Sequence, residues 1–150
     1  MRKILFALTI TAFHFTYSQN LEIHKGKIEY YEYSENVSFK IKRMKEHKKG
    51  GFGFIPLRGF TSYKFYLTFE NHSSSEQIVN LDSIYMANQE TKKRYKIKWF
   101  NTSGFGSKLK PTFKLRPDKR KTFIVFYIFE KNQKPYFLVN NKLKPITHND

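Results

Sequence analysis

The chain has 150 residues, no cysteine and a formal net charge of +16, and this length suits one domain but excludes two cores of normal size. The lack of cysteine excludes disulfide frameworks, thiolate metal sites and cysteine nucleophiles. Aromatic residues make up 18% and hydrophobic residues 39% of the chain, which excludes a disordered protein. The mean hydropathy of -0.63 excludes a polytopic membrane protein.

The first predicted element is a cleaved export signal over 1–18. Two basic residues precede an apolar run over 4–15, and Thr16 and Ser18 place small side chains where a signal peptidase needs them. The run is shorter than the roughly 20 residues of a membrane-spanning helix, so we expect no transmembrane anchor. Cleavage removes two positive charges and no acidic residue, which leaves a charge of +14 on a single mature domain over 19–150. We expect a secreted or periplasmic protein.

Most of the mature chain alternates apolar and polar side chains. The alternation is clearest over 63–69, and a strand with this period of two has one buried face. The run 123–129 is apolar on both faces, which predicts a central buried strand. Turn-forming residues separate the strands at intervals of about 8–12 residues, the spacing of a sandwich or barrel. The predicted strands are 27–33, 37–44, 63–69, 78–86, 95–99, 112–115, 123–129 and 134–139.

The segment 45–60 fits no strand, because it is long, rich in glycine and aromatic residues, and has no clear period. Two interpretations of its aromatic rings, and of one ring in a later glycine-containing loop, stay open. They form a contact surface for a partner protein, as loop aromatics on rigid scaffolds often do, or they fold back and plug the open end of the core. The rings concerned are Phe52, Phe54, Phe60 and Phe105.

The middle of the chain also carries a recognisable pattern. The strand 63–69 runs into Asn71-His72-Ser73, and Leu115-Arg116-Pro117-Asp118 precedes the run 123–129. This pattern resembles the secreted immunoglobulin-like domains of the bacterial telokin-like family of unknown function, in which Gly stands at the position of Asp118. The resemblance covers about 60–139 and implies a β-sandwich. It implies no catalytic residues, because none define the family.

Residue patterns for catalysis or metal binding are weak. No Gly-x-Ser-x-Gly occurs, and His72 beside Ser73, Ser74 and Ser75 is typical of a polar turn. The four mature histidines stand 23 or more residues apart, and acidic residues form no cluster. We therefore expect no catalytic residue, metal or cofactor, and a protein that is not an enzyme.

The basic residues are the one feature that points to a ligand. They alternate with apolar residues in two predicted strands, so their outward faces are expected to form a positive surface for a polyanion. Lysines outnumber arginines 22 to 6, which favours solvated, anti-aggregation charge over specific phosphate recognition. The candidate binding residues are Lys40, Lys42, Arg43, Lys92, Lys93, Arg94, Lys96 and Lys98.

These observations predict an all-β, immunoglobulin-like sandwich of about 7–8 antiparallel strands. We expect an exported, non-enzymatic binding or accessory domain of the bacterial cell envelope, whose unidentified partner is a protein or an anionic glycan. Nucleic acid is a weaker expectation that the sequence does not exclude. The alternative is an extracellular enzyme or enzyme inhibitor whose site the sequence does not reveal.

Overall fold

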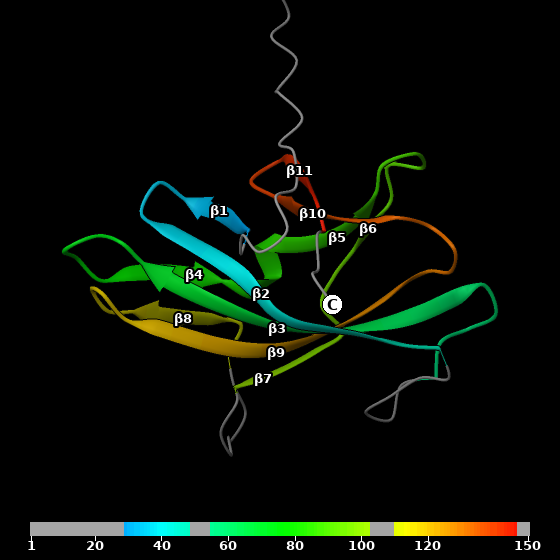
Figure 1. Cartoon of the computed structure of the whole chain (residues 1–150), viewed down its shortest axis with the longest axis horizontal. Coiled ribbons are helices and arrows are strands. Elements are labelled where there is room, and N and C mark those ends of the chain that lie inside the picture. The colour runs from blue at the N-terminus through cyan, green and yellow to red at the C-terminus, as the bar shows by residue number, and fades with distance from the viewer. Residues whose placement is uncertain (1–28, 49–54, 103–109, 147–150) are drawn as a thin grey trace, which may run out of the picture.

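The computed structural model describes residues 29–48, 55–102 and 110–146, which form eleven strands and one 3-10 turn (Figure 1). The predicted export signal and Phe52, Phe54 and Phe105 lie outside the described residues. The elements are β1 (Tyr30–Ser34), β2 (Val37–His47), β3 (Phe60–Asn71), β4 (Gln77–Asn80), η1 (Leu81–Ser83), β5 (Ile84–Asn88), β6 (Arg94–Tyr95), β7 (Trp99–Thr102), β8 (Thr112–Leu115), β9 (Arg120–Glu130), β10 (Pro135–Val139) and β11 (Lys142–Pro145).

The first layer is a five-stranded antiparallel sheet in the order β1-β2-β3-β9-β7. Its centre is the pair of long strands β3 and β9, which are in register from Phe60 opposite Glu130 to Glu70 opposite Arg120. Alternation along β3 sends Phe65, Leu67 and Phe69 toward the core and the residues between them to the outer face. The outer face therefore carries polar side chains and Tyr66 along β3, whereas β9 places the apolar Ile124, Phe126 and Ile128 there.

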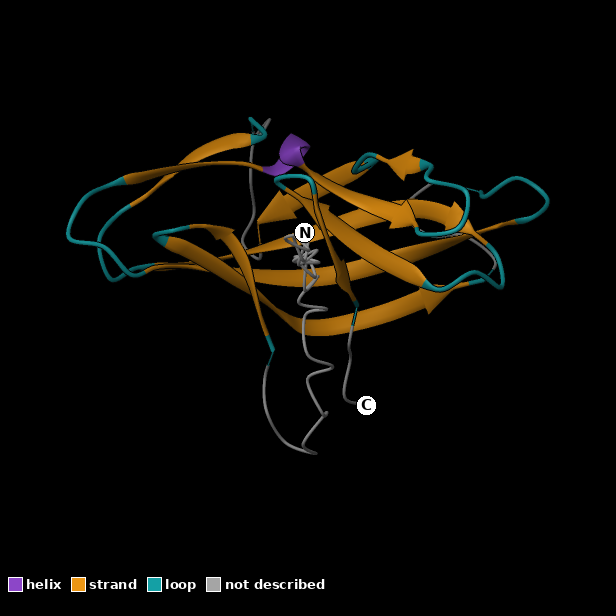
Figure 2. Cartoon of the chain, turned by 90° about the horizontal axis from the view of Figure 1, so that it is seen from above, coloured by secondary structure: helices purple, strands orange, loops and turns teal. Residues whose placement is uncertain are grey.

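The second layer combines a sheet in the order β11-β10-β5-β6 with the two-stranded sheet β4-β8. The chain passes from β4 to β5 through η1, because the Asn80 side chain accepts a hydrogen bond from the Asp82 N–H at 3.0 Å and turns the backbone. The prediction of one continuous strand over 78–86 was therefore wrong. Figure 2 shows the strands in two layers, with η1 on the outer side of the second.

Aromatic rings from both layers fill the core. The ring of Phe137 in β10 lies 5.4 Å from that of Tyr31 and 5.7 Å from that of Phe39 in favourable edge-on contacts, and 5.3 Å from the tilted ring of Phe65. The Tyr127 hydroxyl donates to the Ile84 carbonyl oxygen across the layers at 2.9 Å, so this buried polar group is satisfied. Two layers of antiparallel strands packed over one aromatic core confirm the predicted all-β sandwich.

Two other strand predictions differ from the structure. The predicted strand 95–99 is divided between β6 in the second layer and β7 in the first, because the chain crosses between layers after Tyr95. Asn140 and Asn141 both have positive φ, at 49° and 62°, which makes the tight hairpin that leads into the unpredicted β11. The divided strands and β11 bring the number of strands in the described residues to eleven, above the predicted 7–8.

No helix in the described part of the chain is long and apolar enough to cross a membrane.

Candidate anion-binding surface

A β-bulge at Lys42 changes which side chains β2 presents. Ile41 is opposite Leu67 and Arg43 is opposite Tyr66 in β3, so Lys42 is an extra residue in the strand. Ile41 and Met44 pack against the core, whereas Lys42 and Arg43 between them are both exposed. Bulges redirect side chains in this way. Two consecutive cations therefore stand on one face, where a regular strand would present only one.

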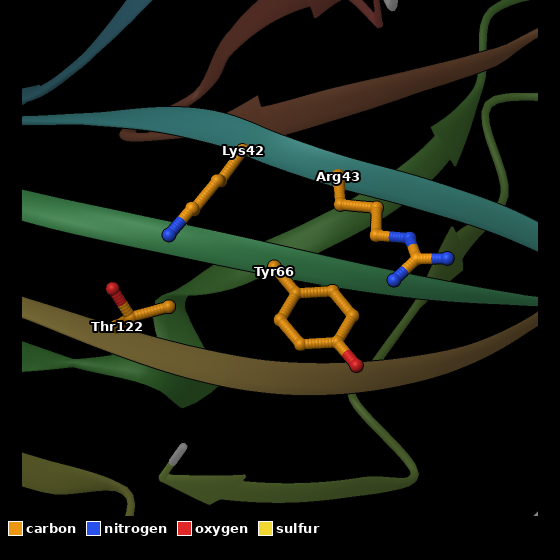
Figure 3. Close-up of a pocket in the computed structure, with 4 residues that line it drawn as sticks. All are labelled: Lys42, Arg43, Tyr66 and Thr122. Atoms are coloured by element: carbon orange, nitrogen blue, oxygen red, sulfur yellow. The ribbon is translucent and has the colours of Figure 1, made fainter. Parts of the chain in front are cut away.

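These two cations line a shallow groove of about 370 Å³ with Tyr66 of β3 and Thr122 of β9 (Figure 3). We call it the outer-face groove, because its lining residues point away from the core. The Thr122 hydroxyl lies 2.9 Å from that of Thr68, and Lys64 Nζ lies 5.1 Å from the centre of the Tyr66 ring. Neither Lys42 nor Arg43 forms an ion pair with another described residue.

Lys40, the third predicted binding residue in β2, has a different environment. Its Nζ lies 2.8 Å from Glu70 Oε1 and donates a hydrogen bond to the Tyr30 hydroxyl at 2.9 Å. The hydrogen bond to Glu70 raises the pKa of Lys40, with a second contribution from Tyr30. Arg120 Nε is 3.2 Å from the same Glu70 oxygen. The charge of Lys40 is therefore compensated by Glu70, and Lys40 is not among the residues that line the groove.

The second predicted basic group lies elsewhere in the fold. Lys92 and Lys93 belong to the turn between β5 and β6, Arg94 begins β6 in the second layer, and Lys93 Nζ is 3.4 Å from Glu130 Oε1. The remaining two candidates, Lys96 and Lys98, are exposed on the connection from β6 to β7. The structure thus places the eight candidates in two regions, of which only Lys42 and Arg43 line the outer-face groove.

Of the predicted aromatic contact residues, the structure describes Phe60. It is the first residue of β3, is half-buried, and its ring lies 6.4 Å from that of Tyr95 in an edge-on contact. Tyr95 in turn packs 5.1 Å from the core ring of Phe129. Phe60 therefore packs against Tyr95 near one end of the sandwich, and its role as a partner contact or as a plug stays a prediction.

The serine-rich segment after β3 forms a hydrogen-bonded turn. The buried Asn71 side chain accepts from the Ser73 N–H at 2.9 Å and donates to the carbonyl oxygens of Ser75, at 2.8 Å, and Leu115, at 2.9 Å. His72 Nε2 lies 2.7 Å from the Ser38 hydroxyl on the sheet surface. These contacts explain the Asn-x-Ser pattern as a structural tie between β3 and β8.

The Leu-x-Pro pattern also has a structural explanation. Asp118 has a φ of 52°, and the Lys119 N–H donates to the Arg116 carbonyl oxygen at 3.2 Å. This is a turn with Pro117 at its second position and a left-handed third residue, the place where glycine is usual. Asp118 thus adopts the left-handed conformation that a Gly at this position would adopt readily.

Within the described ranges, no three His, Asp or Glu side chains gather closely enough to hold a metal ion.

The sequence did not single out Tyr66 and Thr122. Tyr66 is the one aromatic residue at an outward position of the alternating strand, and Thr122 directly precedes the apolar run of β9. The break in the spacing of apolar residues between Ile41 and Met44 was a signal for the bulge. Together these features would have pointed to the groove.

No protein-family model and no curated protein matches the chain. A conserved hypothetical protein from Bacillus anthracis has a similar structure, with a TM-score of 0.57 and 19% identity over 81% of this chain and 94% of that one. A Bacillus subtilis protein proposed to be a lipoprotein gives a TM-score of 0.52 at 12% identity over 79% of this chain, which spans only 34% of that protein. At such identities these likenesses establish the fold alone. The protein shares its β-sandwich with bacterial proteins, and its membership of the telokin-like family is not confirmed.

Proposed function

We propose that this protein is an exported, non-enzymatic binding module of the bacterial cell envelope, and that it holds an anionic glycan in the outer-face groove. The observation that carries the proposal is the bulge, which sets Lys42 and Arg43 side by side beside Tyr66. Lys42 and Arg43 form no ion pair with any residue that the structure describes and are therefore available to a ligand, whereas Glu70 already compensates Lys40.

The lining suits an acidic sugar better than a protein. The Arg43 guanidinium matches a carboxylate or sulfate with two parallel hydrogen bonds, and Lys42 adds a point charge. The half-buried Tyr66 ring offers an apolar surface to the face of a sugar ring, and the Thr122 hydroxyl can donate to or accept from sugar hydroxyls. A protein partner, the other expectation from the sequence, usually docks through exposed aromatic or aliphatic anchors, and the groove has only Tyr66.

Location in the envelope is supported by two observations. The sequence begins with the pattern of an export signal over 1–18, and the Bacillus subtilis protein of similar fold is proposed to be a lipoprotein. A sheet face is also a suitable platform for an extended polymer, because its side chains repeat at regular intervals along and across the strands.

The test compares an acidic polysaccharide with its neutral form. We expect the mature protein to bind oligogalacturonate and not the methyl-esterified polymer, measured by calorimetry at low salt. The double variant Lys42→Glu with Arg43→Glu is expected to lose about a hundredfold in affinity, because each charged contact contributes roughly 1.5 kcal/mol or more.

The matched control is Lys92→Glu with Arg94→Glu, which makes the same change in net charge in the second basic region. We expect this control to lose less than about threefold, through weakened long-range attraction only. Equal losses in the two double variants, or equal binding of the esterified polymer, would contradict the proposal.

A further inference from the structure

Two aliphatic side chains project from the turn that precedes β3. Ile55 is 85% exposed and Leu57 is 79% exposed, and they are the two most exposed large hydrophobic residues that the structure describes. Exposed aliphatic residues are ordinary when they are scattered singly. These two are separated only by Pro56 and lie just before the turn at Arg58 and Gly59, so they form a local apolar tip.

Backbone hydrogen bonds hold this tip in place. The Phe60 N–H donates to the Leu57 carbonyl oxygen at 3.0 Å, and the Lys131 N–H donates to the Gly59 carbonyl oxygen at 2.8 Å. Gly59 has a φ of 87°, a conformation that favours glycine and sets the tight turn. Leu57 therefore projects from a backbone that is fixed to the β9–β10 turn.

Three turns meet at this end of the sandwich, at the right of Figure 1: 55–59, 89–93 and 131–134. We call this region the turn end. Glu130 links the end of β9 to the two strands that flank the turn 89–93, because its carboxylate accepts hydrogen bonds from the Tyr95 hydroxyl at 2.7 Å and from the Asn88 side-chain amide. The hydrogen bond from Tyr95 is the main cause that lowers the pKa of Glu130. Burial, followed by the hydrogen bond to Glu130, raises the pKa of Tyr95 to about 12.

Exposed cations lie at the same end of the sandwich as the apolar tip. They come from all three turns, and they outnumber the exposed acidic residue of these turns, Glu90. Glu130 is already engaged by its neighbours. The cations are Arg58, Lys92, Lys93, Lys131 and Lys134. An exposed aliphatic tip at a cationic end of the fold is complementary to an anionic bilayer, whose headgroups attract the cations while its acyl boundary accepts the aliphatic side chains.

We propose that the turn end docks onto an anionic lipid surface, with Ile55 and Leu57 inserting among the headgroups. The tip is exposed and shares its end of the sandwich with exposed cations, which suits a planar and deformable anionic partner. This inference goes beyond the proposed glycan binding and does not depend on it, because no residue of the turn end lines the outer-face groove.

The test uses vesicle co-sedimentation of the mature protein. We expect binding to phosphatidylcholine vesicles that contain phosphatidylglycerol and little binding to pure phosphatidylcholine. Ile55→Ser with Leu57→Ser is expected to lower partitioning to the anionic vesicles by about tenfold or more, because each inserted side chain contributes through its buried area. Arg58→Glu with Lys131→Glu is expected to lower it by about tenfold as well.

Two controls make the result decisive. Ile78→Ser removes an aliphatic side chain that is 65% exposed on β4, and this variant is expected to bind vesicles like the unmodified protein. The groove variant Lys42→Glu with Arg43→Glu is expected to keep most of its vesicle binding, so failure of the glycan proposal would not affect this test. The inference is overturned if the unmodified protein does not bind anionic vesicles, which is the result expected if the tip contacts another protein instead. It is also overturned if Ile55→Ser with Leu57→Ser binds the vesicles as well as Ile78→Ser does.

Discussion

The outer-face groove and the turn end are both cationic, yet their cations have different neighbours. In the groove, Lys42 and Arg43 lie beside the Tyr66 ring and a threonine hydroxyl on a flat sheet. At the turn end, exposed cations lie in the same group of chain segments as the exposed Ile55 and Leu57. The first arrangement offers hydrogen bonds and a ring surface to a polar polymer, and the second offers aliphatic groups to a lipid interface.

This difference shows why net charge alone does not identify a ligand. A charge of +16 implies attraction to polyanions in general. The selective information is in what stands beside each cation and in whether an acid already compensates it, as Glu70 compensates Lys40. Two lysines that look alike in the sequence, such as Lys40 and Lys42, therefore have different environments in the structure.

Salt dependence is expected to separate the two regions with the largest effect. Binding of oligogalacturonate should weaken by roughly tenfold between about 0.05 and 0.2 M salt, because ionic contacts dominate it. Binding to anionic vesicles should weaken by only about threefold, since insertion of aliphatic side chains is less sensitive to salt. Titrations of one protein preparation at several salt concentrations measure both slopes. Equal slopes would contradict the distinction between the two regions.

Glu130→Gln is expected to have a smaller effect that is confined to the turn end. It weakens the charged hydrogen bonds to Tyr95 and Asn88, so the Tm at neutral pH should fall by roughly 3 °C, as expected for about 1 kcal/mol in a domain of this size. Oligogalacturonate affinity should not change, because Glu130 does not line the groove.

The same variant gives a pH signature. The pKa of Glu130 is lowered in the folded protein, so its carboxylate stabilises the fold at pH values above its unfolded pKa, and this contribution is lost as the pH falls through the folded pKa. The Tm difference between the unmodified protein and Glu130→Gln should therefore be largest above about pH 5 and shrink below about pH 4. A difference that is constant over this range would show that Glu130 acts through packing alone.

Local patterns were sufficient to predict most strands. Alternation located the centre of β3, and the strand 112–115 matches β8 residue for residue. The division of 78–86 was not predictable from period, because Val79 and Leu81 continue the alternation while the Asn80 side chain bends the chain. The hydrogen bonds of one side chain decide this bend, and hydrophobic periodicity does not register them.

The candidate site was predicted only in part, for a related reason. Lys42 and Arg43 were identified from a group of basic residues in a predicted strand, but their common face depends on a bulge that pairing with β3 creates. Tyr66 and Thr122 join them across three strands, and such contacts arise only when distant segments pair. The turn end is likewise an assembly of three turns. Ile55 and Leu57 lay in a segment that the sequence identified for its aromatic rings instead.

The most direct test of the central claim is an NMR titration of the isotope-labelled mature protein with oligogalacturonate. We predict that the largest shift changes occur at Lys42, Arg43, Tyr66 and Thr122, with little change at Ile55, Leu57 or Lys131. Changes concentrated at the turn end, or spread evenly over all exposed lysines, would contradict the assignment of the outer-face groove as the glycan site.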